Sequence, residues 1–222
     1  MTAGSTLNVA ELEVEGISGR KLFVGLIREF RRIHELTTQV AREKGLDFTQ
    51  QELIHISYYC LYYGTGPNSS RILKQSLAKF DKAFIKDLVD KLDKKERKVW
   101  IKNGENFPYV PFEGHQSRLG HYYRHLYQAV RYVDQQTMLT CDQKYEFVKT
   151  IRAQLSNHEQ ALLLLNSLSP MGCSWWKDGY MLEYRMVKNI PKEFFEPEKE
   201  IDISKFFESN YFEWEEVNVQ HN

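Results

Sequence analysis

One stretch of the chain, Phe112 to Asp134, gathers side chains that could carry out acid–base and phosphate chemistry. It holds His115, His121 and His125, three of the seven histidines, and interleaves them with arginines and tyrosines. Histidine titrates near neutral pH, and the guanidinium of arginine binds phosphate through two parallel hydrogen bonds. Such a set could cleave RNA without a metal, because one group takes the 2′-hydroxyl proton while a cation stabilises the charged phosphorane.

The same stretch has the period of an amphipathic helix. Its apolar side carries Leu119, Tyr123, Leu126, Val130 and Val133. Its polar side carries Arg118, His121, Arg124, His125 and Gln128. Arg118 and His125 are seven residues apart, so they share one face, with a rise of about 10 Å between their Cα atoms.

We therefore predict Arg118, His121 and His125 as catalytic residues, with His115 as another candidate acid or base. The predicted substrate-binding residues are His115, Gln116, Tyr122, Arg124 and Arg152. For Arg152 a structural role is the alternative, in which its guanidinium satisfies carbonyl groups at a helix C-terminus. For the whole cluster the alternative is that these side chains only satisfy a helix packed under the proline-containing loop 103–114.

A metal site is not expected. His121 and His125 have the i, i+4 spacing of two zinc ligands, but no HExxH glutamate accompanies them, and His115 or distant carboxylates would have to complete the site. The glycines form neither a P-loop nor a dinucleotide-binding pattern, so we predict no cofactor. The three cysteines are far apart, which is typical of reduced thiols in a cytoplasmic protein.

Composition indicates an ordinary globular protein of 222 residues with formal net charge zero. No apolar run approaches the length of a membrane span, and no signal peptide is recognisable, so we expect a cytoplasmic location. Strand signals are almost absent, which predicts an all-α fold, a single bundle of about seven to nine helices. We expect an arm at 1–17, a helical domain at 18–190 and an acidic, aromatic tail at 191–222.

The expected helices have recognisable starts and ends. They are 18–44, 49–64 with a Thr49/Glu52 capping box, 70–79, 80–100, the central helix ending at 134, 144–155 capped by Asp142, 160–168 with a Ser156/Glu159 capping box, and 178–188. The lysines after residue 87 could form a nucleic-acid patch, or a solvated face on which they pair with nearby acids. The tail could dock through its phenylalanines, be partly disordered, or cover the basic helix.

Several separated stretches resemble the bacterial phage abortive infection protein family. They are GRKLFVGLIREF at 19–30, QELIHISYYCLYYG at 51–64, FEGHQSRLGHYYRHLYQAVRYVD at 112–134 and YEFVKTIRAQLSNHEQALLLLN at 145–166. GHQSRLGHYYRHLYQ is the most specific of these strings, and the resemblance extends over roughly 18–190. It implies an antiviral role, typically that of an effector that harms the infected cell.

A second resemblance is to HEPN-type ribonucleases, whose site is an arginine and a following histidine with four to six residues between them. Arg118 and His125 have six residues between them, and Arg152 and His158 have five, but the second pair crosses the predicted break at Ser156. The HEPN resemblance implies RNA as substrate and a homodimer. The alternative is a non-catalytic module that docks a phage or host partner through the same helix, and a regulator encoded by a neighbouring gene is a further expected partner.

Overall fold

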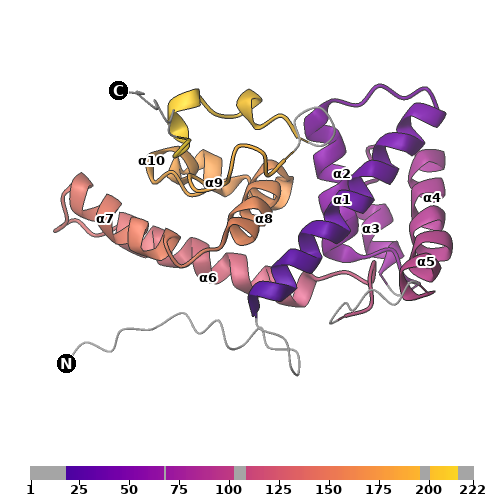
Figure 1. Ribbon diagram of the computed structural model, residues 1–222, viewed down its shortest axis with the longest axis horizontal. Coiled ribbons are helices and arrows are strands. Elements are labelled where there is room, and N and C mark those ends of the chain that lie inside the picture. The colour runs from indigo at the N-terminus through magenta and orange to yellow at the C-terminus, as the bar shows by residue number, and fades with distance from the viewer. Residues whose placement is uncertain (1–18, 68, 103–108, 196–200, 215–222) are drawn as a thin grey trace, which may run out of the picture. The chain divides into compact units, whose positions relative to one another are not determined.

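The protein is all-α, as predicted. Figure 1 shows the computed structural model, which describes residues 19–67, 69–102, 109–195 and 201–214. Within these ranges every regular element is a helix. The α-helices are α1 (Gly19–Glu43), α2 (Gln50–Tyr63), α3 (Ser70–Ser76), α4 (Lys82–Asp90), α5 (Arg97–Lys102), α6 (Gln116–Asp134), α7 (Cys141–Arg152), α8 (Asn157–Leu168), α9 (Ser174–Lys177) and α10 (Tyr180–Glu183).

The chain divides into two compact units, residues 1–45 with 59–121 and residues 46–58 with 122–222. Helices α2 and α6 each begin in one unit and end in the other. The predicted arm at 1–17 lies outside the described residues. The predicted domain at 18–190 stays a prediction.

The first unit is built on α1, which packs against α4. Leu26, Phe30 and Ile33 recur at helical spacing on α1 and are buried, which is why this segment forms an amphipathic helix. The helix ends before Gly45, whose φ of +66° lies in the left-handed region that glycine adopts without a Cβ clash. The predicted Thr49 cap of α2 is also present, since the Glu52 amide donates to the Thr49 hydroxyl at 3.2 Å.

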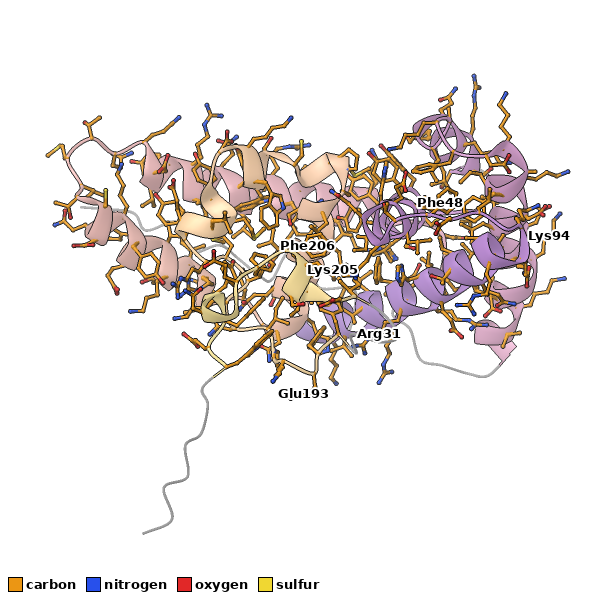
Figure 2. All side chains as sticks on the ribbon, turned by 90° about the horizontal axis from the view of Figure 1, so that it is seen from above. Arg31, Phe48, Lys94, Glu193, Lys205 and Phe206 are labelled. Carbon is orange, nitrogen blue, oxygen red and sulfur yellow. The ribbon has the colours of Figure 1, made fainter. Side chains whose placement is uncertain are left out.

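The lysine-rich segment is continuous helix, because α4 runs through a π-helical turn at Lys91–Glu96 into α5. Its acids are paired with cations. The ion pairs are Lys91–Glu43 at 2.6 Å, Lys94–Asp90 at 3.1 Å, Arg97–Asp93 at 3.2 Å and Arg32–Glu96 at 2.7 Å. Lys94, labelled in Figure 2, is exposed. These pairs favour the interpretation of the run as a solvated face.

The second unit is built on α8, whose four consecutive leucines at 162–165 are fully buried. The Ser156/Glu159 capping box starts this helix as predicted: the Glu159 amide donates to the Ser156 hydroxyl at 3.3 Å.

Helix α7 begins earlier than predicted. Its N-cap is Thr140, which forms a capping box with Gln143, so the assignment of Asp142 as the cap was wrong.

The predicted helix at 178–188 is interrupted. Only the single turn of α10 is helical, and residues 184–189 form turns. Gly179 before α10 has a φ of +77°, and Arg185 after it has a φ of +47°, a left-handed conformation that ends a right-handed helix.

The described part of the tail is docked, as one of the sequence interpretations proposed. The buried side chains in 201–214 are Ile201, Ile203, Phe207, Tyr211 and Phe212. The Tyr211 hydroxyl donates to the carbonyl of Met181 at 2.8 Å, and the indole of Trp214 donates to that of Ile190, also at 2.8 Å. Aromatic packing and these backbone acceptors hold the segment against residues 181–190.

Candidate functional site

Helix α6 has the two faces that its sequence predicts. Leu119, Tyr123, Leu126 and Val130 are buried, and Val133 is half-buried. The exposed side chains are Gln116, Ser117, His121, Arg124, His125, Gln128, Arg131 and Tyr132. Packing of the apolar side therefore leaves a basic face, which we define as Arg118, His121, Arg124, His125 and Arg131, turned outward.

Of the three predicted catalytic residues, His121 and His125 are exposed, whereas Arg118 is half-buried in the first turn of α6. All three belong to one continuous helix, so their spacing is that of the helix itself. Of the predicted substrate-binding residues, Gln116 and Arg124 lie exposed on α6, where they could contact a ligand.

Tyr122 is engaged inside the protein. Its hydroxyl donates to the buried Glu159 carboxylate at 3.0 Å, and Glu159 also accepts from the Ser156 amide at 2.8 Å. Burial, followed by the negative charge of Glu159, raises the pKa of Tyr122 well above its ordinary value. The phenol thus stays protonated and acts as a donor to Glu159.

His115 lies apart from the exposed histidines, because it is buried just before α6. Its Nε2 is 3.0 Å from Oε2 of Glu29, a fully buried residue of α1. With Glu29 ionised, Nε2 donates to its carboxylate, which only accepts hydrogen bonds. Nδ1 of His115 is buried and has no hydrogen-bond partner among the residues that the structure describes. The other oxygen of Glu29 accepts from the Phe112 amide at 2.8 Å.

Tyr109 completes this buried cluster. Its ring meets that of His115 edge to face, with centroids 4.6 Å apart. Its pKa is raised, first by burial and then by the negative charge of Glu29, while the positive charge of Arg118 acts in the opposite direction. The group of Glu29, Tyr109 and His115, which we call the Glu29 cluster, therefore brings together a carboxyl group, a phenol and an imidazole, and the charge of Arg118 also acts on the pKa of the phenol.

A close backbone contact positions the Glu29 cluster. The His115 amide donates to the carbonyl of Tyr62 at 2.9 Å, which joins the end of α2 to the start of α6. Gly64 and Gly114 make this approach possible because neither has a Cβ. A Cβ on Gly114 would lie 2.3 Å from the Tyr63 carbonyl oxygen, and one on Gly64 would lie 2.2 Å from the Glu113 carbonyl carbon. Phe112 has a φ of +64°, a costly conformation for a residue with a side chain.

Arg152 has the structural role that the sequence left as its alternative. It is 3% exposed, and one guanidinium nitrogen donates to the carbonyls of Tyr184 at 2.6 Å and Arg185 at 3.2 Å. These carbonyls follow α10, where the helical hydrogen bonds have ended, so a charged donor is well placed to satisfy them.

Glu29 is the residue that sequence reasoning missed. Its signal was available, because Glu29 follows Leu22 and Leu26 and precedes Ile33 on one stripe of α1, and its neighbours on that stripe are buried. A lone carboxylate in an apolar stripe needs a buried partner. Nothing in the sequence names that partner, which lies 86 positions further on.

Two further observations concern the described residues only. No three or more His, Cys, Asp or Glu side chains converge there in a way that could hold a metal ion. None of the helices described combines the length and the apolar character that a membrane crossing requires.

No curated protein and no solved structure matches the chain. The HEPN-type resemblance is not tested by these comparisons and stays a prediction. Residues 114–195, from the turn before α6 to the segment after α10, match the model of the family described as "Putative phage abortive infection protein", which confirms the family resemblance for this segment.

Proposed function

We propose that this protein is a phage-defence effector that acts on RNA through the basic face of α6, as a metal-independent ribonuclease. The observation that carries the proposal is the composition of this helix. From residue 114 to residue 133 the chain has three arginines, three histidines and neither Asp nor Glu. His115 is buried beside Glu29, but because the apolar side of α6 is buried, the three arginines with His121 and His125 lie on its outward side, where the arginine charges would attract a phosphate backbone.

The dimensions of the basic face suit a short RNA segment. From Arg118 to Arg131 the helix rises about 20 Å, which is enough to contact several phosphates. Arginine binds phosphate with paired donors, and exposed histidine can exchange a proton near neutral pH. We assign phosphate binding to Arg118, and the acid and base roles to His121 and His125. In the HEPN-type interpretation a second copy completes the site.

A cleavage assay tests the proposal directly. Purified protein is incubated with total RNA and transfer RNA in EDTA, and the variants Arg118→Ala, His121→Ala and His125→Ala are compared with it. The control is Arg71→Ala, which removes an exposed arginine from α3. We expect wild type and the control to cleave, and the three α6 variants to lose at least about 100-fold in rate, the usual contribution of an acid–base group for the histidines and of a charge-stabilising donor for Arg118.

The same variants distinguish catalysis from docking in a phage-protection assay. Loss of protection together with loss of cleavage supports the ribonuclease. Intact RNA with every protein, combined with loss of protection in the α6 variants, would instead make α6 a docking surface for a phage or host partner. Specific activity should also rise with protein concentration if two copies form the site, and a constant value would argue against the dimer.

A further inference from the structure

Glu29 is an unusual residue in this fold because its carboxylate is completely buried. A buried carboxylate is costly unless donors surround it. Glu29 has two such donors in the segment that leads into α6: the Phe112 amide at 2.8 Å and the His115 imidazole at 3.0 Å. One side chain of α1 thus fixes both the backbone and a side chain of the turn from which α6 starts.

Tyr109 extends this connection toward the basic face. Its ring contacts that of His115, with centroids 4.6 Å apart. The carbonyl of His115 accepts from the Leu119 amide at 2.8 Å, so the residue that Glu29 holds also begins the hydrogen bonds of α6 beside Arg118. The charges of Glu29 and Arg118 act in opposite directions on the pKa of Tyr109, so its phenol is sensitive to both residues. Arg118 is correspondingly the half-buried member of the basic face, whereas His121, Arg124 and His125 are exposed.

We propose that Glu29 is a positioning residue for Arg118: through Tyr109 and the His115 turn, it fixes the first turn of α6 and directs the Arg118 guanidinium to a phosphate. The coupling of Glu29 to Arg118 is independent of what α6 binds. The assignment of an RNA phosphate as the ligand of Arg118 rests on the proposed function.

The chain offers a change that removes the charge and keeps the shape. Glu29→Gln retains an oxygen that can accept from the Phe112 amide, but it removes the negative charge that orders the Glu29 cluster. The matched control is Glu43→Gln on the same helix, since Glu43 pairs on the surface with Lys91. Tyr109→Phe is a second variant, which keeps the ring against His115 and removes only the hydroxyl.

The first measurement needs no RNA. In ¹⁵N spectra of the arginine Nε–H groups, we expect Glu29→Gln and Tyr109→Phe to shift the Arg118 resonance and leave that of Arg124 in place, whereas Glu43→Gln should shift neither. Circular dichroism checks that each variant keeps its helix content. If both variants are folded and the Arg118 resonance is unchanged in both, the positioning role is wrong.

The second measurement is a double-mutant cycle on the affinity for a short single-stranded RNA. We expect Glu29→Gln to weaken binding by about three- to thirty-fold, the range typical of coupled neighbours. In the Arg118→Ala background the same change should have no further effect, while in the His125→Ala background its full effect should remain. Equal effects in both backgrounds would overturn the coupling. Absence of RNA binding by the wild type would refute the proposed function alone, because the resonance shifts still test the role of Glu29.

Discussion

Replacing Arg152 by alanine should destabilise the protein strongly, although its sequence context suggested a ligand contact. The side chain is buried and donates to the carbonyls of Tyr184 and Arg185. A hydrogen bond from a charged group contributes about 1.5–3 kcal/mol. The truncation removes the charged donor from both carbonyls, of which that of Arg185 still accepts from the Lys188 amide at 3.0 Å. We therefore expect a loss of about 3–5 kcal/mol in the free energy of unfolding, similar to that for breaking a buried charge interaction.

Thermal unfolding followed by circular dichroism measures this effect. For a chain of this size the expected loss corresponds to a fall in Tm of about 6–20 °C. Arg152→Lys should recover part of the stability, because one ammonium can replace some of the guanidinium's contacts but not its planar geometry. The control is Arg124→Ala, which removes an exposed arginine and should change Tm little.

The same variant separates stability from ligand binding in cells. If Arg152 acts only on the fold, phage protection by Arg152→Ala should return at a lower growth temperature, because the folded fraction rises. A loss of less than about 1 kcal/mol, together with loss of protection at every temperature, would refute the structural role and restore Arg152 as a ligand-binding residue.

Three further predictions follow from local geometry. Gly114→Ala should prevent stable folding, since its Cβ would lie 2.3 Å from a carbonyl oxygen. Gly45→Ala, whose Cβ would have nothing within 4 Å, should lower the free energy of unfolding by only about 1 kcal/mol, because of its left-handed φ. Thermal melts of the two variants test this difference. A maleimide at pH 8 should label the exposed Cys141 quickly and Cys60 only after unfolding. Burial raises the pKa of the Cys60 thiol to about 12 and keeps it protonated. Rapid labelling of both thiols in the native protein would contradict this. Ser156→Ala should lower the free energy of unfolding by about 1 kcal/mol in urea denaturation, because α8 loses the hydroxyl cap of its N-terminus. An unchanged midpoint of the urea transition would show that the cap contributes little.

Most of the helix positions could be predicted from the sequence. The polar and apolar sides of α6 agree with the helical phase, and the capping boxes at Thr49 and Ser156 start α2 and α8 as expected. The errors occurred where distant groups compete with local preference. The helix predicted at 178–188 is broken at Arg185, and the carbonyl of this residue accepts a hydrogen bond from Arg152. The helical spacing of apolar residues does not predict that the Arg185 carbonyl accepts a hydrogen bond from Arg152.

The sequence alone determined that α6 is an amphipathic helix with a basic outer face, because helical phase and capping depend on residues within a few positions of one another. Only the tertiary structure decided which of its polar side chains remain exposed. It buries His115 beside Glu29, 86 positions earlier in the chain, and turns the Tyr122 hydroxyl to Glu159, 37 positions later. The physical reason is that a buried polar group must find a partner, and that partner is set by how the helices pack.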